Sequence, residues 1–170
     1  MLVGISRPSD RGRSVEAVYA LLAPAVLGYF RAHRLPDPEG LTGDVFVSVA
    51  RGLPTFTGDD GALRRWVFTI AHHRGVDEVR RRARRPDALP IDGLDLPGPS
   101  GEDDGLDPAL LEALAVLTPD QREVVVLRHV ADLSVADVAR ATGRSEGSVK
   151  MLCARGLDAL AAHLGVPSPD

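Results

Sequence analysis

Eight arginines lie among 22 residues in the middle of the chain, at positions 64–85. The stretch, RRWVFTIAHHRGVDEVRRRARR, also carries Trp66, Phe68 and an adjacent pair of histidines. Guanidinium groups bind phosphate oxygens, and aromatic rings stack on unpaired bases. These residue types on one helix favour contact with a nucleic-acid strand. The arginines at 80–85 also fit a solvated helix end, where positive charge complements the helix dipole.

The loop before this helix supplies a second set of groups that suit a base. Phe56 lies between the hydroxyls of Thr55 and Thr57, a combination that could line a pocket for a base taken out of a duplex. Trp66 shares the apolar stripe of the helix with Leu63, so we expect it in the core.

A metal site is the alternative use of His72, His73 and Asp77, as in a metal phosphohydrolase. Adjacent histidines point about 100° apart on a helix, so they do not easily share one ion. No Glu or Cys lies at the usual ligand spacing. We therefore expect no metal, no cofactor and no enzyme, and we expect Cys153 to be a buried structural thiol.

Residues 134–155, SVADVARATGRSEGSVKMLCAR, have the form of a helix-turn-helix. Ser134 and Ser145 are N-cap residues, and Gly143 permits the tight turn between the helices. The second helix has the size to enter a major groove, where its N-terminal residues meet base edges. An ordinary helical hairpin is the alternative. The candidate duplex-binding residues are Arg144, Ser145, Glu146, Ser148, Lys150 and Arg155.

Charge is segregated along the chain, which has a net charge of −4 overall. Residues 64–85 carry a net +6, whereas residues 86–108 carry seven acids and no base. The acidic stretch is rich in Pro and Gly and has no apolar periodicity, which predicts a flexible linker over 86–107. One cysteine, no signal peptide and no long apolar run predict a cytoplasmic protein without membrane insertion.

Apolar periodicity and capping residues predict an all-α fold. Helices are expected over 14–34, about 41–53 and 62–85, then from 108, 118, 134 and 145, the last reaching 164. The segment EVVVLRHV is β-branched but follows a capping box at Thr118, so it too is predicted to be helical. The chain is thus expected to form two small helical domains, 14–85 and 108–165, joined by the acidic linker.

Both halves resemble extracytoplasmic-function sigma factors of bacterial RNA polymerase, of the sigma-70 family. LTGDVFVSVARGLPTF and LRRWVFTIAHHRGVDEVRRR are similar to the promoter-melting domain of that family. LAVLTPDQREVVVLRHVADLSVADVARATGRSEGSVKMLCARGLDAL is similar to its C-terminal domain, which reads the upstream promoter element. The resemblance covers about residues 14–164 and implies a factor that directs promoter recognition, melting and transcription initiation.

The resemblance also implies roles for individual residues. Asp44 and Phe46 would dock on the clamp of the largest polymerase subunit, and the linker would thread the polymerase channel. The loop from Thr55 to Asp60 would capture a flipped base of the −10 element. The residues that would hold the melted strand are Thr55, Phe56, Arg65, Thr69, His72, His73, Asp77, Arg80 and Arg81. The helix from Ser145 would read the −35 element as duplex. The implied partners are core RNA polymerase (largest-subunit clamp and β subunit), promoter DNA and an anti-sigma factor.

The sequence departs from the family pattern in three places. Gly40 and Gly43 stand where the family often has an acid and a Gln. The pair His72-His73 replaces a commoner Arg-Asn-like pair, and the first 13 residues match nothing. The alternative function is a stand-alone helix-turn-helix regulator with an N-terminal sensing domain, but it leaves the Trp/His/Arg helix unexplained.

Overall fold

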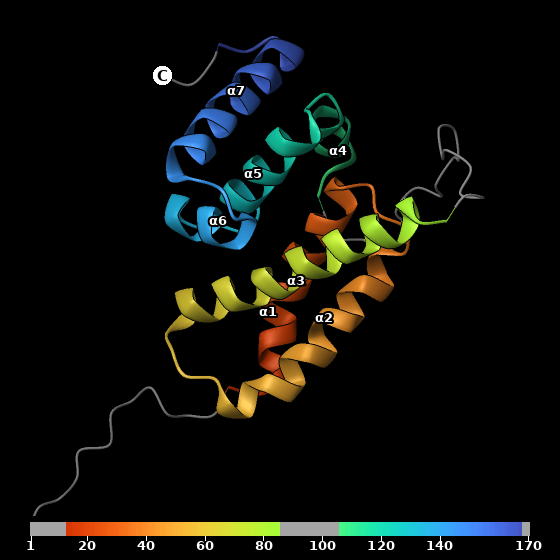
Figure 1. Cartoon of the computed structure of the whole chain (residues 1–170), viewed down its shortest axis with the longest axis vertical. Coiled ribbons are helices and arrows are strands. Elements are labelled where there is room, and N and C mark those ends of the chain that lie inside the picture. The colour runs from red at the N-terminus through yellow and green to blue at the C-terminus, as the bar shows by residue number, and fades with distance from the viewer. Residues whose placement is uncertain (1–12, 86–105, 168–170) are drawn as a thin grey trace, which may run out of the picture.

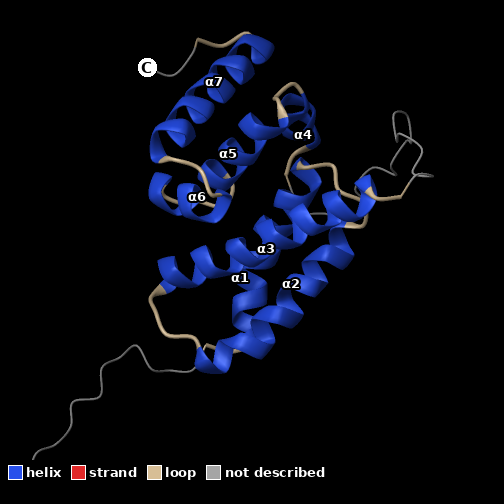
Figure 2. Ribbon diagram, in the orientation of Figure 1, coloured by secondary structure: helices blue, strands red, loops and turns tan. Residues whose placement is uncertain are grey.

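A computed structural model of the chain describes residues 13–85 and 106–167. The regular structure of these residues is entirely helical, which confirms the all-α prediction (Figures 1 and 2). The elements are α1 (Val15–Ala32), α2 (Pro38–Gly52), the 3-10 turn η1 (Leu53–Thr55), α3 (Asp60–Ala83), α4 (Pro108–Ala115), α5 (Pro119–His129), α6 (Val135–Thr142) and α7 (Glu146–Leu164). Most of the predicted linker, residues 86–105, lies outside the described residues.

The first three helices form an N-terminal bundle, in which α2 packs against both α1 and α3. Val18, Leu22, Val26 and Phe30 recur every four residues along α1 and are at most 2% exposed, as expected for the core face of an amphipathic helix. By length and composition α1 could also cross a membrane. Its apolar stripe is instead buried against α2 and α3, which is the position of a core helix.

The C-terminal bundle, α4–α7, contains the predicted helix-turn-helix in α6 and α7. Gly143 has a φ of +69° at the turn, the left-handed conformation that favours glycine. Val138 and Val149 pack the two helices together and are fully buried. The β-branched run of α5 is helical as predicted, because α5 is covered by both α6 and α7 and buries neighbouring valines on more than one side.

Local capping chemistry sets most of the helix starts. The side chains of Ser14, Thr118, Ser134 and Ser145 each accept a hydrogen bond from the backbone N–H three residues on. Each satisfies one of the N–H groups that a helix leaves unpaired at its start. The caps predicted at Thr118, Ser134 and Ser145 are confirmed.

The predicted bounds of three helices were wrong by a few residues. α2 begins at Pro38, not near 41, because the Asp37 side chain accepts a 3.0 Å hydrogen bond from the Gly40 N–H. α1 ends at Ala32 rather than 34. α3 spans Asp60–Ala83 rather than 62–85, since Asp59 caps it.

The two bundles are in contact, which the prediction of two tethered domains did not include. α3 packs against α6, and α1 packs against α4 and α5 (Figure 1). Leu106 lies on Gly28 of α1, where a β-carbon would be 3.1 Å from the Leu106 Cγ. The domain boundaries 14–85 and 108–165 stay predictions.

Candidate nucleic-acid interface

One stripe of α3 faces the C-terminal bundle. Arg65, Thr69 and His72 follow each other at intervals of four and three residues, which places them on one side of the helix. The Arg65 Nη1 lies 3.5 Å from the Asp137 Oδ2 on α6, and the Asp137 side chain is only 10% exposed. Thr69 donates a 2.8 Å hydrogen bond to the Arg65 carbonyl. In this arrangement α5 and α6 cover the predicted strand-binding stripe only in part, because the Arg65 side chain is still 41% exposed.

His72 is the most deeply covered residue of this stripe. It is 9% exposed, and its Nδ1 lies 2.7 Å from the Oε1 of Glu123 on α5. The Tyr29 hydroxyl donates to the same oxygen at 3.0 Å, and the His33 Nε2 lies 3.8 Å from the Glu123 Oε2. One carboxylate of the C-terminal bundle therefore gathers three side chains of the N-terminal bundle.

Burial and charge act in opposite directions on this cluster. Burial alone would raise the pKa of Glu123, but the His72 hydrogen bond and the nearby His33 bring that pKa below its ordinary value. Burial raises the pKa of Tyr29 well above 10, and the adjacent Glu123 charge raises it further. Burial lowers the pKa of His33, although Glu123 opposes the shift. The cluster thus favours an ionised Glu123 and an un-ionised Tyr29.

A second contact between the bundles comes from Arg64. Its guanidinium donates to the carbonyl of Val130, at 3.3 Å, and to that of Ala131. These carbonyls follow the last turn of α5, where unpaired acceptors attract a cation. Arg64 also lies over the ring of Phe68, 5.7 Å from its centroid. Two consecutive arginines of the basic helix, Arg64 and Arg65, are therefore engaged with the C-terminal bundle.

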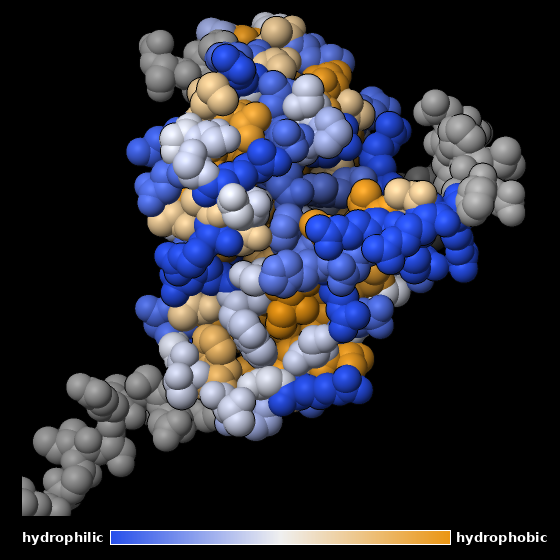
Figure 3. Space-filling view, in the orientation of Figure 1, coloured by the Kyte–Doolittle hydropathy of each residue, from blue (hydrophilic) through white to orange (hydrophobic). Residues whose placement is uncertain are grey.

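The remaining strand-binding candidates lie on the open part of α3. His73, Asp77 and Arg80 are exposed, and Figure 3 shows hydrophilic side chains gathered over the C-terminal half of this helix. Arg81 is exposed but donates to both oxygens of Glu78, at 2.8 and 2.7 Å. This pairing lowers the pKa of Glu78, so part of the positive charge of Arg81 is already matched.

The loop before α3 is built around an aromatic stack. The rings of Phe56 and Trp66 lie 5.1 Å apart at an interplanar angle of 22°. On α2, a β-carbon at Gly52 would come within 2.6 Å of the Trp66 ring. Trp66 is half-buried between the two rather than in the deep core, which corrects the prediction made for it. Thr55 is exposed and donates a 3.1 Å hydrogen bond to the Gly52 carbonyl.

The two residues expected to dock on polymerase have different environments. Asp44 is exposed on α2. Phe46 is only 5% exposed and packs edge-on against Tyr19, with ring centroids 4.8 Å apart. Tyr19 and Val47 are each 50% exposed. Phe46 therefore offers little surface of its own and supports the exposed ring of Tyr19.

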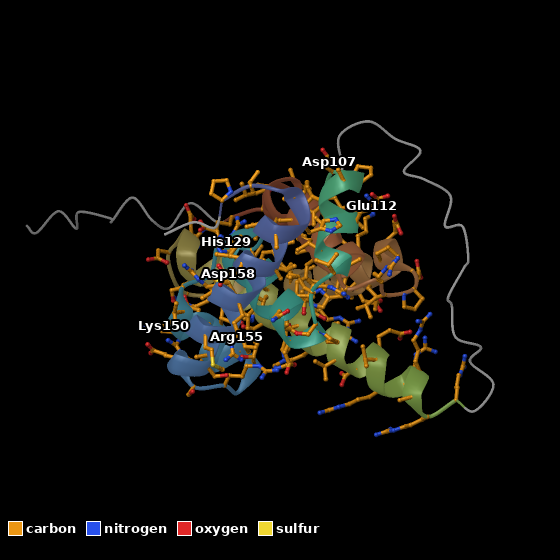
Figure 4. The ribbon with its side chains drawn as sticks, turned by 90° about the horizontal axis from the view of Figure 1, so that it is seen from above. Asp107, Glu112, His129, Lys150, Arg155 and Asp158 are labelled. Carbon is orange, nitrogen blue, oxygen red and sulfur yellow. The ribbon has the colours of Figure 1, made fainter. Side chains whose placement is uncertain are left out.

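The outer face of the helix-turn-helix presents the predicted duplex-binding residues. Glu146, Lys150 and Arg155 are exposed on α7, and Figure 4 labels Lys150 and Arg155 along it. Ser145 caps the helix through the backbone N–H of Ser148, at 3.2 Å. The predicted set also includes Arg144, whose Nη2 lies 2.6 Å from Asp120 Oδ1 on α5. Arg144 is thus drawn toward the bundle and Ser148 is half-buried, whereas Glu146, Lys150 and Arg155 remain open.

The metal alternative gains no support from the geometry. No group of three or more His, Cys, Asp or Glu that could hold a metal ion occurs within the described parts of the chain. His72 points to Glu123, whereas His73 is exposed. Cys153 is half-buried, 3.6 Å from the His129 Nε2, and burial raises the pKa of its thiol.

Comparison with known proteins identifies both bundles. The model of the family described as Sigma-70 region 2 matches residues 15–85, and that described as Sigma-70, region 4 matches residues 108–160. The ECF RNA polymerase sigma factor ShbA of Streptomyces griseus is 33% identical over 86% of this chain and 87% of its own length. The ECF sigma factor SigC of Mycobacterium tuberculosis is 34% identical over 94% of this chain and 88% of its own length.

The chain belongs to the sigma-70 family, in its extracytoplasmic-function group. It is also 34% identical to the ECF sigma factor BldN of Streptomyces coelicolor over 80% of this chain, which spans 54% of BldN. Sigma factors direct RNA polymerase to promoters and generally have no enzymatic activity of their own. The stand-alone regulator is therefore not favoured.

Two solved structures share the fold of this sigma factor. RpoE of Bartonella quintana, in complex with the anti-sigma factor NepR, has a TM-score of 0.73 at 24% identity, covering 89% of this chain and 96% of that one. CnrH, in complex with the cytosolic domain of CnrY, has a TM-score of 0.61 at 23% identity, covering 92% of this chain and 91% of that one. At this identity the likeness concerns the fold alone.

Sequence reasoning missed several residues that shape the surface of this sigma factor. Glu123 is 51 residues from His72 and 94 from Tyr29, so no local pattern connects them. Glu78 has an arginine three residues later, a spacing that predicts an ion pair on a helix. Asp137 stands three residues after Ser134, and its partner Arg65 is 72 residues away.

Proposed function

We propose that the two bundles divide promoter recognition between them. The N-terminal bundle, residues 14–85, binds the clamp of core polymerase and holds the melted −10 strand on α3. The C-terminal bundle, residues 108–165, inserts α7 into the duplex −35 element. The observation that carries this proposal is the exposed face of α7, with Lys150 and Arg155, on the same chain as the arginine-rich α3.

Two promoter elements about 25 base pairs apart are separated by roughly 85 Å at 3.4 Å per step. In the structure α3 is in contact with α6, and His72 is in contact with α5. Strand binding by Arg65 and His72 therefore requires the bundles to separate. The predicted acidic linker, residues 86–107, is the tether that would permit this separation.

We further propose that the protein acts in the cytoplasm without enzymatic activity and is held by an anti-sigma factor when it is not in use. This partner is supported by the complexes in which RpoE and CnrH were solved. It would cover the same apolar and basic surfaces that polymerase and promoter need, including Tyr19 and Val47.

Run-off transcription with core polymerase and no other sigma factor tests the proposal. We expect transcripts from a promoter with both elements only when this protein is present. The H73A/R80A variant, changed on the open part of α3, should lose activity on closed duplex more than on a template already melted at −10. The K150A variant should lose activity only when the promoter depends on its −35 element. Absence of promoter-specific transcripts with the unaltered chain would overturn the proposal.

A further inference from the structure

The residue just before α1 contacts the loop that precedes α3. Arg13 donates from Nη1 to the Gly58 carbonyl at 2.9 Å and from Nη2 to the Asp60 Oδ1 at 2.8 Å. Its neighbour Ser14 caps α1, so the Arg13 backbone is fixed at the start of that helix. One guanidinium thereby joins the beginning of α1 to a segment 45 residues further along the chain.

The loop that Arg13 grips is tightly folded. Gly58 has a φ of +152°, which side-chain-bearing residues rarely adopt. A β-carbon at Gly58 would lie 2.8 Å from the Ala62 Cβ and 3.1 Å from the Phe56 ring. Asp59 accepts a 2.7 Å hydrogen bond from the Ala62 N–H and caps α3. The path of the backbone at Gly58 therefore sets where Phe56 lies.

Phe56 in turn covers Trp66 on α3, with the rings stacked 5.1 Å apart. The Arg13 hydrogen bond to the Gly58 carbonyl restrains the backbone two residues after Phe56, and so helps to hold the Phe56 ring on Trp66. The bond to Asp60 adds little by itself, because the Asp60 side chain is 85% exposed and exposed ion pairs contribute weakly. The contact to the Gly58 carbonyl is therefore the one that holds the loop.

We propose that Arg13 is a positioning residue for the base-capturing loop. By fixing the Gly58 carbonyl relative to α1, it holds Thr55 and Phe56 in the arrangement that receives an unpaired base of the −10 strand. This inference rests on the proposed function of the loop. It assigns a role to a residue in the N-terminal segment that showed no resemblance to the family.

The contact between Arg13 and the Gly58 carbonyl can be tested by spectroscopy without DNA or polymerase. Trp66 is the only tryptophan of the chain, so its fluorescence reports directly on the stack with Phe56. We expect Arg13→Ala to increase the quenching of Trp66 by acrylamide, and Arg13→Lys to have a smaller effect. Asp60→Asn should change little because the Gly58 bond remains. Arg51→Ala, which removes an exposed arginine of α2, is the matched control. The role of Arg13 in holding the loop is overturned if quenching is unchanged in Arg13→Ala, or if it increases as much in Asp60→Asn.

A second test uses full-length protein with core polymerase on promoters that carry single-base changes in the −10 element. Arg13→Ala should lose about fivefold or more of the discrimination between favoured and disfavoured bases, the lower end of what one stacked base contributes. Its affinity for core polymerase should match that of the unaltered protein. Unaltered discrimination, or an equal loss of polymerase affinity, overturns the positioning role. If the unaltered protein itself does not discriminate between bases of the −10 element, the proposed function of the loop fails. The quenching result still decides whether Arg13 holds the loop in place.

Discussion

The Nδ1 of His72 lies 2.7 Å from the Oε1 of Glu123, and this contact joins the helix predicted to hold melted DNA to the bundle predicted to read duplex DNA. The same oxygen accepts the hydroxyl proton of Tyr29 at 3.0 Å. A single carboxylate thus completes the hydrogen bonds of two side chains from the other bundle. Contact between the bundles therefore depends in part on a carboxylate that the sequence did not single out.

Glu123→Ala is therefore expected to loosen the contact between the bundles. It removes the acceptor that the Tyr29 hydroxyl and the His72 ring share and leaves them only their 3.4 Å contact with each other. A buried polar group left unsatisfied costs about 1–3 kcal/mol. The bundles can avoid this cost by separating, so small-angle X-ray scattering should show a larger radius of gyration. Glu112→Ala, at an exposed position of α4, is the control. A radius of gyration that stays the same in Glu123→Ala would contradict the prediction.

Acid should weaken the same contact. The pKa of His33 is lowered from its ordinary value of 6.5, chiefly by burial, so the unfolded chain takes up this proton at a higher pH than the folded protein. The free energy of unfolding should therefore fall as the pH drops below 6.5. The pKa of Glu123 is also lowered, from 4.5, and its contribution is present above that value and lost as the pH falls through the folded pKa.

Urea unfolding at about pH 7.5 and about pH 5.5, on either side of the ordinary histidine pKa, measures this loss. His33→Asn should reduce the difference between the two conditions, because the buried imidazole is gone. His163→Asn, at an exposed position of α7, should leave the difference as it is in the unaltered protein. Equal differences in all three proteins would rule out His33 as the source.

The helix starts were predictable because the signals that set them are local. Ser14 and Ser145 lie within three residues of the N–H groups that they cap. The helix predicted from 108 begins there, after Asp107 as its N-cap residue. The same dipeptide, Asp37-Pro38, begins α2, although the predicted start of that helix was near 41. Its neighbours Pro and Gly favoured a loop, and the left-handed conformation of Asp37, with a φ of +51°, has no clear sequence signature.

The covered part of the candidate interface could not be predicted in the same way. Periodicity places Arg65, Thr69 and His72 on one stripe of α3, but it does not say what faces that stripe. The partners Glu123 and Asp137 come from helices of the other bundle, 51 and 72 residues away. Charge patterning predicted a basic helix beside an acidic linker. The acidic side chains that contact this stripe of α3 in the described residues instead belong to α5 and α6.

Lys150→Ala should weaken the binding of the duplex element without changing the fold. Lys150 is exposed on α7, and loss of one phosphate-binding cation reduces the slope of log affinity against log salt by about 1. Binding of the polymerase complex to a −35-dependent promoter, measured over a series of salt concentrations, gives this slope. Arg51→Ala in α2 removes a cation from the other bundle and should leave the −35 contribution unaltered. A K150A slope equal to that of the unaltered protein would exclude Lys150 from the contact.

Gly156→Ala should destabilise the C-terminal bundle. Alanine favours a helix over glycine by about 1 kcal/mol, but a β-carbon at Gly156 would lie 2.6 Å from the Val125 Cγ2. Overpacking of this kind costs about 1–3 kcal/mol, and relief requires α5 and α7 to move apart. Urea unfolding should therefore show a lower midpoint for this variant, and an unchanged or higher midpoint would show that the helices adjust freely.

Gly43→Ala, on α2, should have the opposite effect and stabilise the protein against urea. Nothing lies within 4 Å of a β-carbon at Gly43, so the variant gains the helix preference of alanine, up to about 1 kcal/mol, without a clash. Gly43 is one of the two positions where the sequence departs from the family pattern in the helix proposed to dock on polymerase. If it is only a gap in that surface, the variant should unfold at higher urea and bind core polymerase with unchanged affinity. Higher stability with weaker polymerase binding would instead show that the partner approaches the backbone of α2 closely at this position, and that the glycine is needed for contact.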